Sequence, residues 1–101
     1  MRRPAQARRS TRRLGYRLDV PHFAYIVRCA DGSLYSGYAR DPVKRSAAHN
    51  AGKGARYTAG RRPVSLVYWE AFESAGDALR RERQLKRLRR AAKEALIVKS
   101  G

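Results

Sequence analysis

The sequence predicts one small domain of mixed α and β structure, with a three-stranded antiparallel sheet flanked by about three helices. The chain has 101 residues, which is the length of a single domain. Segments rich in aromatic and β-branched residues lie on both sides of a segment with helical signals. Two more helical segments follow the last of them. The order strand, strand, helix, strand, helix, helix is typical of a small antiparallel sheet with helices packed against it.

The first two strands are predicted at residues 23–29 and 34–38, which are rich in aromatic and β-branched residues. The three residues between them suit a hairpin loop with Gly32 in the left-handed conformation. With a loop of this length, Tyr25 and Tyr35 point to the same face of the ribbon. A two-residue loop would place them on opposite faces, so their placement depends on the turn.

A helix is predicted after the hairpin because Asp41 suits the N-cap and Pro42 suits the first helical position. The helix should end about two residues before Gly52. Arg45 and His49 are four residues apart, so they share one face of this helix.

The remainder of the chain is predicted as a basic loop followed by one strand and two helices. The loop covers residues 52–62 and is rich in glycine and arginine. The later elements are a strand at 64–72, a helix that begins at Ser74 or Asp77 and ends near Leu88, and a short helix at 91–98.

The first of these two helices carries a carboxylate on its apolar face. Ala78, Leu85 and Leu88 have the spacing of core-facing residues, and Glu82 falls in the same stripe. A buried carboxylate costs several kcal/mol unless it is paired or holds a metal ion. Lys86 lies one turn further on and offers an ion pair. From the helix alone, a structural ion pair and a metal-binding or catalytic role both remain open.

The charge of the chain indicates a polyanionic partner. Lys and Arg number 24 against 8 Asp and Glu, which gives a net charge of +16, and nucleic acid is the commonest polyanion. Residues 1–21 hold seven arginines and one acid. We expect them to be a disordered basic tail, which is either simply solvated or an electrostatic arm for phosphates. The folded domain is expected at residues 22–98, with a short tail at 99–101.

Several protein classes are excluded by composition. Cys29 is the only cysteine, so no intramolecular disulfide can form, and with His22 and His49 it falls short of a four-ligand zinc site. The eight scattered acids leave little room for the carboxylate cluster of a two-metal nuclease. No apolar run approaches the ~20 residues of a membrane span, and no signal peptide is evident. We expect a cytoplasmic protein, with association with the nucleoid as an alternative.

The candidate nucleic-acid contacts lie in the basic loop and on the arginine-rich helix. They are Lys53, Arg56, Tyr57, Arg61, Arg62, Arg80, Arg83 and Arg87. The arginines of the helix are mostly off its apolar stripe and are either a solvated face or a ridge that contacts phosphates. Only two acids lie among residues 77–90, so internal neutralisation does not explain them and phosphate contact is favoured. Tyr57 offers a ring on which an exposed base could stack.

Two triplets carry a resemblance to a known family. Residues 23–25 (Phe-Ala-Tyr) are followed ten positions later by residues 35–37 (Tyr-Ser-Gly), and the pair resembles the two-part signature of the GIY-YIG endonuclease superfamily. Arg45 and Glu82 stand where that family carries its arginine and its metal-binding glutamate. The resemblance covers about residues 22–98 and is closest to small single-domain proteins similar to the N-terminal nuclease domain of the excision-repair protein excinuclease C. The loop at residues 52–58 (Gly-Lys-Gly-Ala-Arg-Tyr-Thr) and residues 61–64 (Arg-Arg-Pro-Val) are features of that group.

The resemblance implies a divalent-metal-dependent DNA endonuclease that hydrolyses phosphodiester bonds, in DNA repair or recombination. Glu82 would hold a single Mg²⁺ or Mn²⁺ ion, and Arg45 would clamp the scissile phosphate. Tyr25 or Tyr35 would accept the proton of the attacking water, and His49 would relay that proton or bind phosphate. The expected partner is nucleic acid, with DNA favoured and branched, nicked and single-stranded forms all open. No membrane partner is expected.

The chain departs from the family pattern in two places. Phe23 replaces the glycine of the first triplet and Ala24 its middle aliphatic residue. The asparagine that several family members carry after the glutamate has no evident match, and its nearest counterpart is Glu94 or a neighbour. A non-catalytic basic nucleic-acid-binding module on the same fold is therefore the alternative function.

Each candidate residue also has a purely structural interpretation. The two tyrosines are typical of strands that pack beneath a helix, and Arg45 alone is typical of an exposed helix position. His49 taken singly is more typical of a surface histidine. We expect Cys29 to be a buried small residue and Trp69 and Phe72 to belong to the core.

Overall fold

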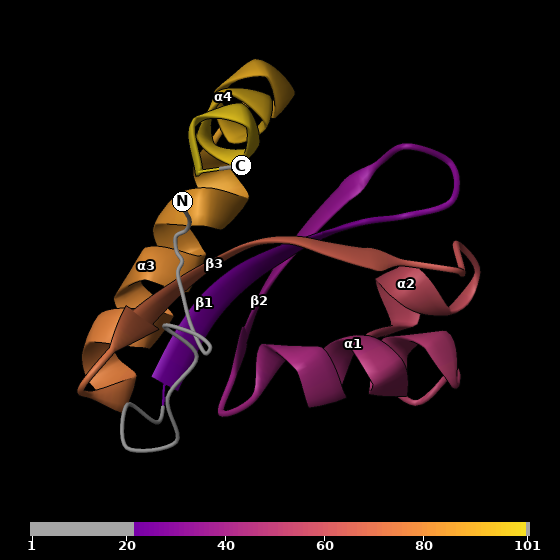
Figure 1. The fold of residues 1–101 in the computed structure, drawn as a ribbon, viewed down its shortest axis with the longest axis horizontal. Coiled ribbons are helices and arrows are strands. Elements are labelled where there is room, and N and C mark those ends of the chain that lie inside the picture. The colour runs from indigo at the N-terminus through magenta and orange to yellow at the C-terminus, as the bar shows by residue number, and fades with distance from the viewer. Residues whose placement is uncertain (1–21, 101) are drawn as a thin grey trace.

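The computed structural model describes residues 22–100, so the predicted N-terminal tail lies outside the described residues. The elements in chain order are β1 (His22–Arg28), β2 (Leu34–Ala39), α1 (Pro42–Asn50), α2 (Arg56–Ala59), β3 (Ser65–Phe72), α3 (Ala75–Arg87) and α4 (Arg90–Ser100). They form a three-stranded antiparallel sheet with helices on both sides (Figure 1). The predicted fold class is confirmed. Within residues 22–100 no helix is long and apolar enough to cross a membrane.

The sheet has the strand order β2-β1-β3, so β1 is central and β2 and β3 are edges. The predicted hairpin register is confirmed: Val27 lies opposite Tyr35, and Tyr25 lies opposite Gly37. Gly32 adopts the left-handed conformation, with φ of +85°. All five residues from 23 to 27 are buried, because helices cover both faces of the central strand.

The two faces of the sheet carry two separate core clusters. On the side of α1 and α2, Tyr25, Val27 and Cys29 of the hairpin pack with Ala39 and Val64. On the opposite side, where α3 and α4 lie (Figure 1), the buried residues are Ala24, Ile26, Tyr68 and Leu85. The buried state of Cys29 confirms its predicted role as a small apolar residue.

The helix ends follow the predicted caps. The Asp41 side chain accepts a hydrogen bond from the Lys44 backbone N–H at the start of α1. Between the two candidate caps of α3, Ser74 is the N-cap, and its hydroxyl accepts from the Asp77 backbone N–H. α3 ends because Leu88 adopts an extended conformation (φ −70°, ψ 143°).

The structure differs from the sequence expectations at three elements. The basic loop contains α2, a single turn that is too short to show a helical periodicity. α4 continues to Ser100, so residues 99 and 100, which were expected in a C-terminal tail, are helical. Trp69 lies on the edge strand β3 and is 36% exposed, so it is not a core residue, whereas Phe72 is half-buried against the cluster on the α3 side.

Candidate active site

Tyr25 lies at the centre of β1, and its ring crosses the neighbouring strand. The side chain is 1% exposed. Its hydroxyl lies so close to Gly37 of β2 that a Cβ on that glycine would be 2.5 Å from the phenolic oxygen. The glycine of the second triplet is therefore required because only a residue without a side chain lets the Tyr25 ring pass toward the β2 edge.

His49 meets the Tyr25 hydroxyl from the last turn of α1. The histidine is fully buried, so its interpretation as a surface residue is wrong. Its Nε2 lies 2.9 Å from the Tyr25 hydroxyl, and its Nδ1 lies 2.7 Å from the hydroxyl of Thr58 in α2. The backbone of Gly54 packs directly against the imidazole ring, where a Cβ would clash. The loop after α1 thus folds back over the histidine and closes it off from solvent.

Burial and the Arg45 guanidinium set the protonation states of this pair. Burial raises the pKa of Tyr25 to about 12, although the interaction with Arg45 acts in the opposite direction. Burial, and secondly the positive charge of Arg45, lower the pKa of His49. At neutral pH Tyr25 is therefore a neutral phenol and His49 a neutral imidazole.

Tyr35 lies on the same face of the hairpin and contacts three helices. Its ring meets the His49 ring edge to face, with 5.5 Å between centroids, and stacks on the Tyr57 ring at 5.8 Å. The ammonium group of Lys86 in α3 lies 5.3 Å from the centre of the Tyr35 ring. Both predicted tyrosines therefore belong to one site at the β2 edge of the sheet.

Glu82 approaches the same edge from α3. Its side chain is 18% exposed and forms an ion pair with Lys86, with 3.5 Å between the oxygen and the ammonium nitrogen. The Glu82 carboxylate is among the groups that raise the pKa of Tyr25, so its negative charge acts at the phenol. The predicted ion pair is present, and it coexists with a position facing the site.

The donor set around Glu82 fits a hard divalent cation held mainly by water. Within residues 22–100 no group of three or more His, Cys, Asp or Glu side chains can hold a metal ion, so an ion at Glu82 would have at most two such ligands. Mg²⁺ commonly binds through one or two carboxylates and keeps several waters. Lys86 is half-exposed, so its side chain can swing away from the carboxylate when a cation binds.

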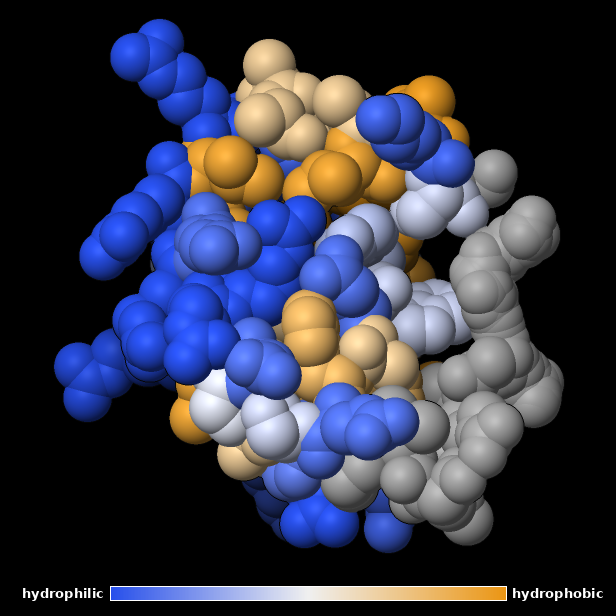
Figure 2. Space-filling model, turned by 90° about the vertical axis from the view of Figure 1, so that its left-hand side faces the viewer, coloured by the Kyte–Doolittle hydropathy of each residue, from blue (hydrophilic) through white to orange (hydrophobic). Residues whose placement is uncertain are grey.

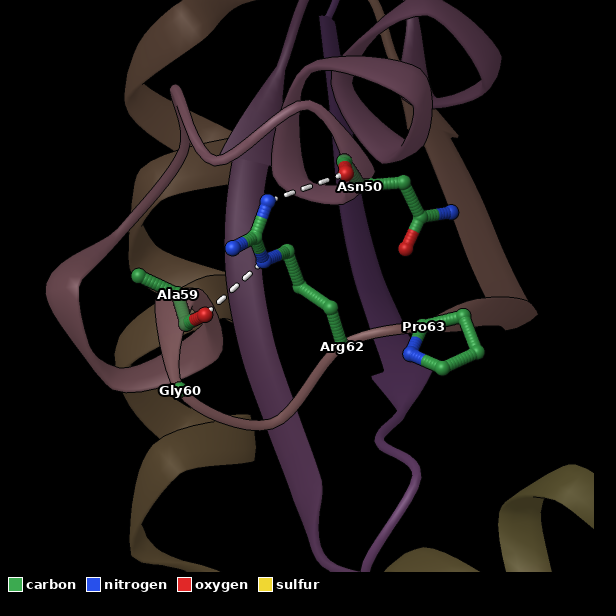
Figure 3. A pocket seen from close by; sticks show the side chains of 5 residues that line it. All are labelled: Asn50, Ala59, Gly60, Arg62 and Pro63. Carbon is green, nitrogen blue, oxygen red and sulfur yellow. Dashed lines mark hydrogen bonds between the residues drawn. The ribbon is translucent and has the colours of Figure 1, made fainter.

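Three of the predicted nucleic-acid contacts are engaged within the protein. Arg61 lies over the Tyr57 ring at 3.9 Å, donates to the Tyr57 carbonyl and pairs with Asp31. Tyr57 therefore has its ring stacked between protein groups. Arg62 donates to the backbone carbonyls of Ala59 (2.9 Å) and Asn50 (3.4 Å), beside an open pocket (Figure 3). These residues brace the basic loop against α1 and the hairpin.

The other contacts remain available to a ligand. Arg80 pairs with Asp77 on the exposed surface of α3. The remaining four side chains are exposed and form no ion pair within residues 22–100; they are Lys53, Arg56, Arg83 and Arg87. Figure 2, which views the molecule from the side of α3, shows long hydrophilic side chains projecting from that side of the molecule.

Glu94 is committed to a structural link. Its carboxylate accepts two hydrogen bonds from Arg28, at 2.7 and 2.8 Å. Arg90 in the same helix donates to the Gly32 carbonyl in the hairpin loop. The residue nearest to the missing family asparagine therefore ties α4 to the hairpin.

Sequence reasoning missed Thr58 and the packing role of Gly54. Both stand in the loop motif at residues 52–58, which by itself indicates only a group of similar proteins. The one local signal is a hydroxyl residue within a glycine- and arginine-rich loop, and nothing in the sequence shows that this loop covers a histidine on the preceding helix.

The comparison with protein families agrees with this geometry. The model of the GIY-YIG catalytic domain matches residues 21–95, and the chain belongs to the GIY-YIG family. Its curated relatives include a UPF0213 protein of Halobacterium salinarum, 52% identical over 75% of this chain and 99% of the relative. A UPF0213 protein of Staphylococcus aureus is 54% identical over 75% of this chain and 93% of the relative.

Two solved structures are similar to the chain. One is the solution NMR structure of a UPF0213 protein from Bacillus halodurans, 47% identical, which covers 79% of this chain and 86% of that one with a TM-score of 0.51. The other, from E. faecalis, is 43% identical and covers 73% and 79% of the two chains with a TM-score of 0.50. The chain is thus similar to a group of small single-domain GIY-YIG proteins.

Proposed function

We propose that this protein is a divalent-metal-dependent endonuclease that hydrolyses phosphodiester bonds in DNA, in repair or recombination. The observation that carries the proposal is the buried hydrogen bond between Tyr25 and His49, at a phenol on which Arg45 and Glu82 also act. Hydrolysis needs a group that takes the proton of water and groups that stabilise charge on the phosphate. This edge of the sheet offers both.

Tyr25 acts as a base without ionising first. With a pKa raised to about 12, its phenolate is too scarce at neutral pH. The phenolic oxygen instead accepts the water proton while its own proton passes to Nε2 of His49, 2.9 Å away. The lowered pKa of His49 keeps this acceptor unprotonated before the reaction. Tyr35 touches the histidine only through its ring, so the relay favours Tyr25 as the base.

Arg45 and Glu82 handle the charge of the phosphate. The exposed guanidinium of Arg45 presents a planar fork of donors that suits phosphate oxygens. Glu82 would hold the divalent cation, which neutralises charge on the phosphate and the leaving oxygen. Lys53, Arg56, Arg83 and Arg87 would contact flanking phosphates without reading bases.

A cleavage assay with two site variants and one control tests the proposal. We expect the parent protein to nick at least one member of a panel of flap, fork, nicked, single-stranded and duplex DNAs with Mg²⁺ or Mn²⁺. Tyr25→Phe should lower the rate at least ~100-fold, and Glu82→Gln should abolish cleavage while DNA binding remains. Tyr38→Phe is the matched control, because that hydroxyl contacts His22 instead of the site. Equal rates for the parent and Tyr25→Phe would remove Tyr25 from the mechanism.

The second candidate function is a nucleic-acid-binding module without turnover. The exposed basic side chains of α3 and the basic loop favour it, as does the use of Glu94 in a structural link. A binder would show affinity that falls steeply with salt and no cleavage of any member of the panel. Glu82→Gln would then bind as tightly as the parent or tighter.

A further inference from the structure

We propose that Thr58 is a positioning residue that fixes the tautomer of His49, so that Nε2 faces Tyr25 as a hydrogen-bond acceptor. This inference rests on the proposed function, because it assigns a direction to the proton path of that site. Thr58 is fully buried, and no role for it follows from phosphate contact. Within residues 22–100 its hydroxyl contacts the imidazole and a backbone carbonyl.

The hydrogen-bond partners of Thr58 determine which group donates. Its hydroxyl oxygen lies 2.9 Å from the carbonyl oxygen of Ala55 and 2.7 Å from Nδ1 of His49. A hydroxyl carries one hydrogen, and a carbonyl oxygen can only accept. Both contacts are hydrogen bonds only when the hydrogen of Thr58 goes to Ala55 and Nδ1 of His49 donates to the threonine oxygen.

The opposite arrangement has weaker geometry. It would require Nδ1 to be bare and to accept from the Ala55 backbone N–H, which lies 3.4 Å away. That separation is beyond the usual range for N–H donors, whereas 2.7 Å is a short contact. It would also leave the Ala55 carbonyl with only its two backbone hydrogen bonds, from the Thr58 and Ala59 N–H groups at 3.2 Å. The contacts at 2.7 and 2.9 Å are both hydrogen bonds when Nδ1 carries the hydrogen. Only the 3.4 Å contact favours the other tautomer.

The tautomer decides the direction of proton movement. A neutral imidazole with its hydrogen on Nδ1 has a lone pair on Nε2, which can only accept from the Tyr25 hydroxyl. Tyr25 then gives its own hydrogen to His49, and its oxygen, which also interacts with Arg45, can accept a proton from water. In the other tautomer Nε2 would donate to Tyr25, and the tyrosine hydrogen would point toward water and oppose the abstraction of its proton.

The step balances with water as the only co-reactant. The O–H bond of water breaks, a lone pair of the hydroxide oxygen forms the new bond to phosphorus, and the bond from phosphorus to the leaving oxygen breaks with its electron pair going to that oxygen. The released proton binds the Tyr25 oxygen while the tyrosine proton binds Nε2 of His49. The imidazolium keeps its Nδ1 hydrogen on Thr58 and later gives the Nε2 proton back through Tyr25 to the leaving oxygen or to solvent.

The surroundings hold the ring in this orientation. Gly54 packs so closely against the imidazole that a Cβ at this position would clash with the ring. The ionisable groups that face the histidine are Tyr25 of β1, Tyr35 of β2 and Arg45 of α1. From α3, Glu82 and Lys86 face those tyrosines instead of the imidazole itself. None of these groups offers Nδ1 an alternative acceptor.

The direct test is the nitrogen chemical shifts of His49 in ¹⁵N-labelled protein at neutral pH, which report the tautomer without any cleavage. We expect the Nδ1–H form in the parent and in Thr58→Ser, which keeps the hydroxyl. Thr58→Val keeps the shape but removes the hydroxyl, so the Nε2–H form should appear. An Nε2–H tautomer in the parent protein overturns the proposal. This readout stands even if the parent cleaves nothing, in which case the proposed function fails and the tautomer assignment is judged separately.

The kinetic test uses the same variants. Thr58→Val should lower kcat by ~10- to 100-fold with little change in KM, because Thr58 touches no DNA. Thr58→Ser should restore the parental kcat. An equal kcat for Thr58→Val and the parent would overturn the proposal. A Thr58→Ser variant that retains the Nδ1–H tautomer but is as slow as Thr58→Val would also overturn it.

Discussion

The two faces of the sheet differ in what they bury. On the side of α3 and α4, the cluster around Ala24, Ile26 and Leu85 is apolar, with Tyr68 at its border. On the side of α1 and α2, the chain buries a series of polar groups from Tyr25 through His49 to Thr58, each hydrogen-bonded to the next. One face is an apolar core, and the other combines an apolar cluster with the candidate site.

The difference originates in the alternation of a single strand. Ala24 and Ile26 of β1 point toward α3, and Tyr25 between them points toward α1. Buried polar groups contribute little net stability when paired and cost much when one partner is lost. The hydrogen-bonded series itself therefore adds little net stability, and changes to it should have effects separable from changes to the apolar core.

The largest effect on stability should come from Leu85→Ala on the apolar face. Leu85 is fully buried in that cluster, so the change should lower the free energy of unfolding by ~2–5 kcal/mol. Urea denaturation checks this, and cleavage per folded molecule should stay near the parental value. Leu79→Ala on the same helix is the control, because Leu79 is 36% exposed. A comparable loss of stability in both variants would contradict the assignment of Leu85 to the core.

Gly37→Ala should damage the chemistry more than the fold. The new methyl group would lie 2.5 Å from the Tyr25 hydroxyl, so the phenol must move away from His49. A displacement of about 1 Å in a catalytic group costs on the order of 100-fold in rate. Gly60→Ala is the control, since a Cβ there meets nothing within 4 Å. Parental cleavage by Gly37→Ala would show that the placement of Tyr25 is unimportant.

The sequence was most informative where structure is local. The hairpin register follows from a three-residue loop, and the start of α1 follows from one aspartate and one proline. The burial of His49 was not predictable, because it depends on a loop that returns to the helix nine residues later. Trp69 was misplaced because its strand is an edge, and strand order does not follow from an apolar pattern.

The residues of the candidate site were predictable from the sequence, but the contacts between them were not. The resemblance to the family signature predicts Tyr25, Tyr35, Arg45 and Glu82 as site residues, and in the structure the other three all act on the Tyr25 phenol. Only the three-dimensional packing shows which tyrosine hydroxyl contacts a ring nitrogen of His49. The sequence also does not predict that Arg61 and Arg62 brace the loop, because their partners are mostly backbone carbonyls.

Acid should destabilise the polar face in particular. Burial lowers the pKa of His49 in the folded protein, whereas the unfolded value is ~6.5. Between the two values the unfolded state binds more protons, so the free energy of unfolding falls as pH drops below ~6.5 and this contribution is lost once pH passes the folded value. Urea midpoints between pH 7.5 and pH 5 measure the slope.

A pair of histidine variants assigns that slope. His49→Gln should remove the His49 contribution, while His22→Gln should retain it because His22 lies at the start of β1 against Tyr38. The apolar face should add nothing in this range, since the pKa of Tyr68 is raised by burial to about 12. An unchanged acid slope in His49→Gln would place the titrating group elsewhere.

The smallest effect on stability should come from removing a buried hydroxyl from the apolar face. Ser36 of β2 lies opposite Ile26 and is 2% exposed, and within residues 22–100 its hydroxyl has no hydrogen-bond partner. Ser36→Ala should therefore raise the free energy of unfolding by about 1 kcal/mol, seen as a higher Tm. Ser46→Ala is the opposite control, because the buried Ser46 hydroxyl donates to the Pro42 carbonyl at 2.9 Å and its loss should destabilise. Destabilisation by Ser36→Ala would mean that this side of the sheet also holds a polar contact that contributes to stability, and the division between the two faces would then be incomplete.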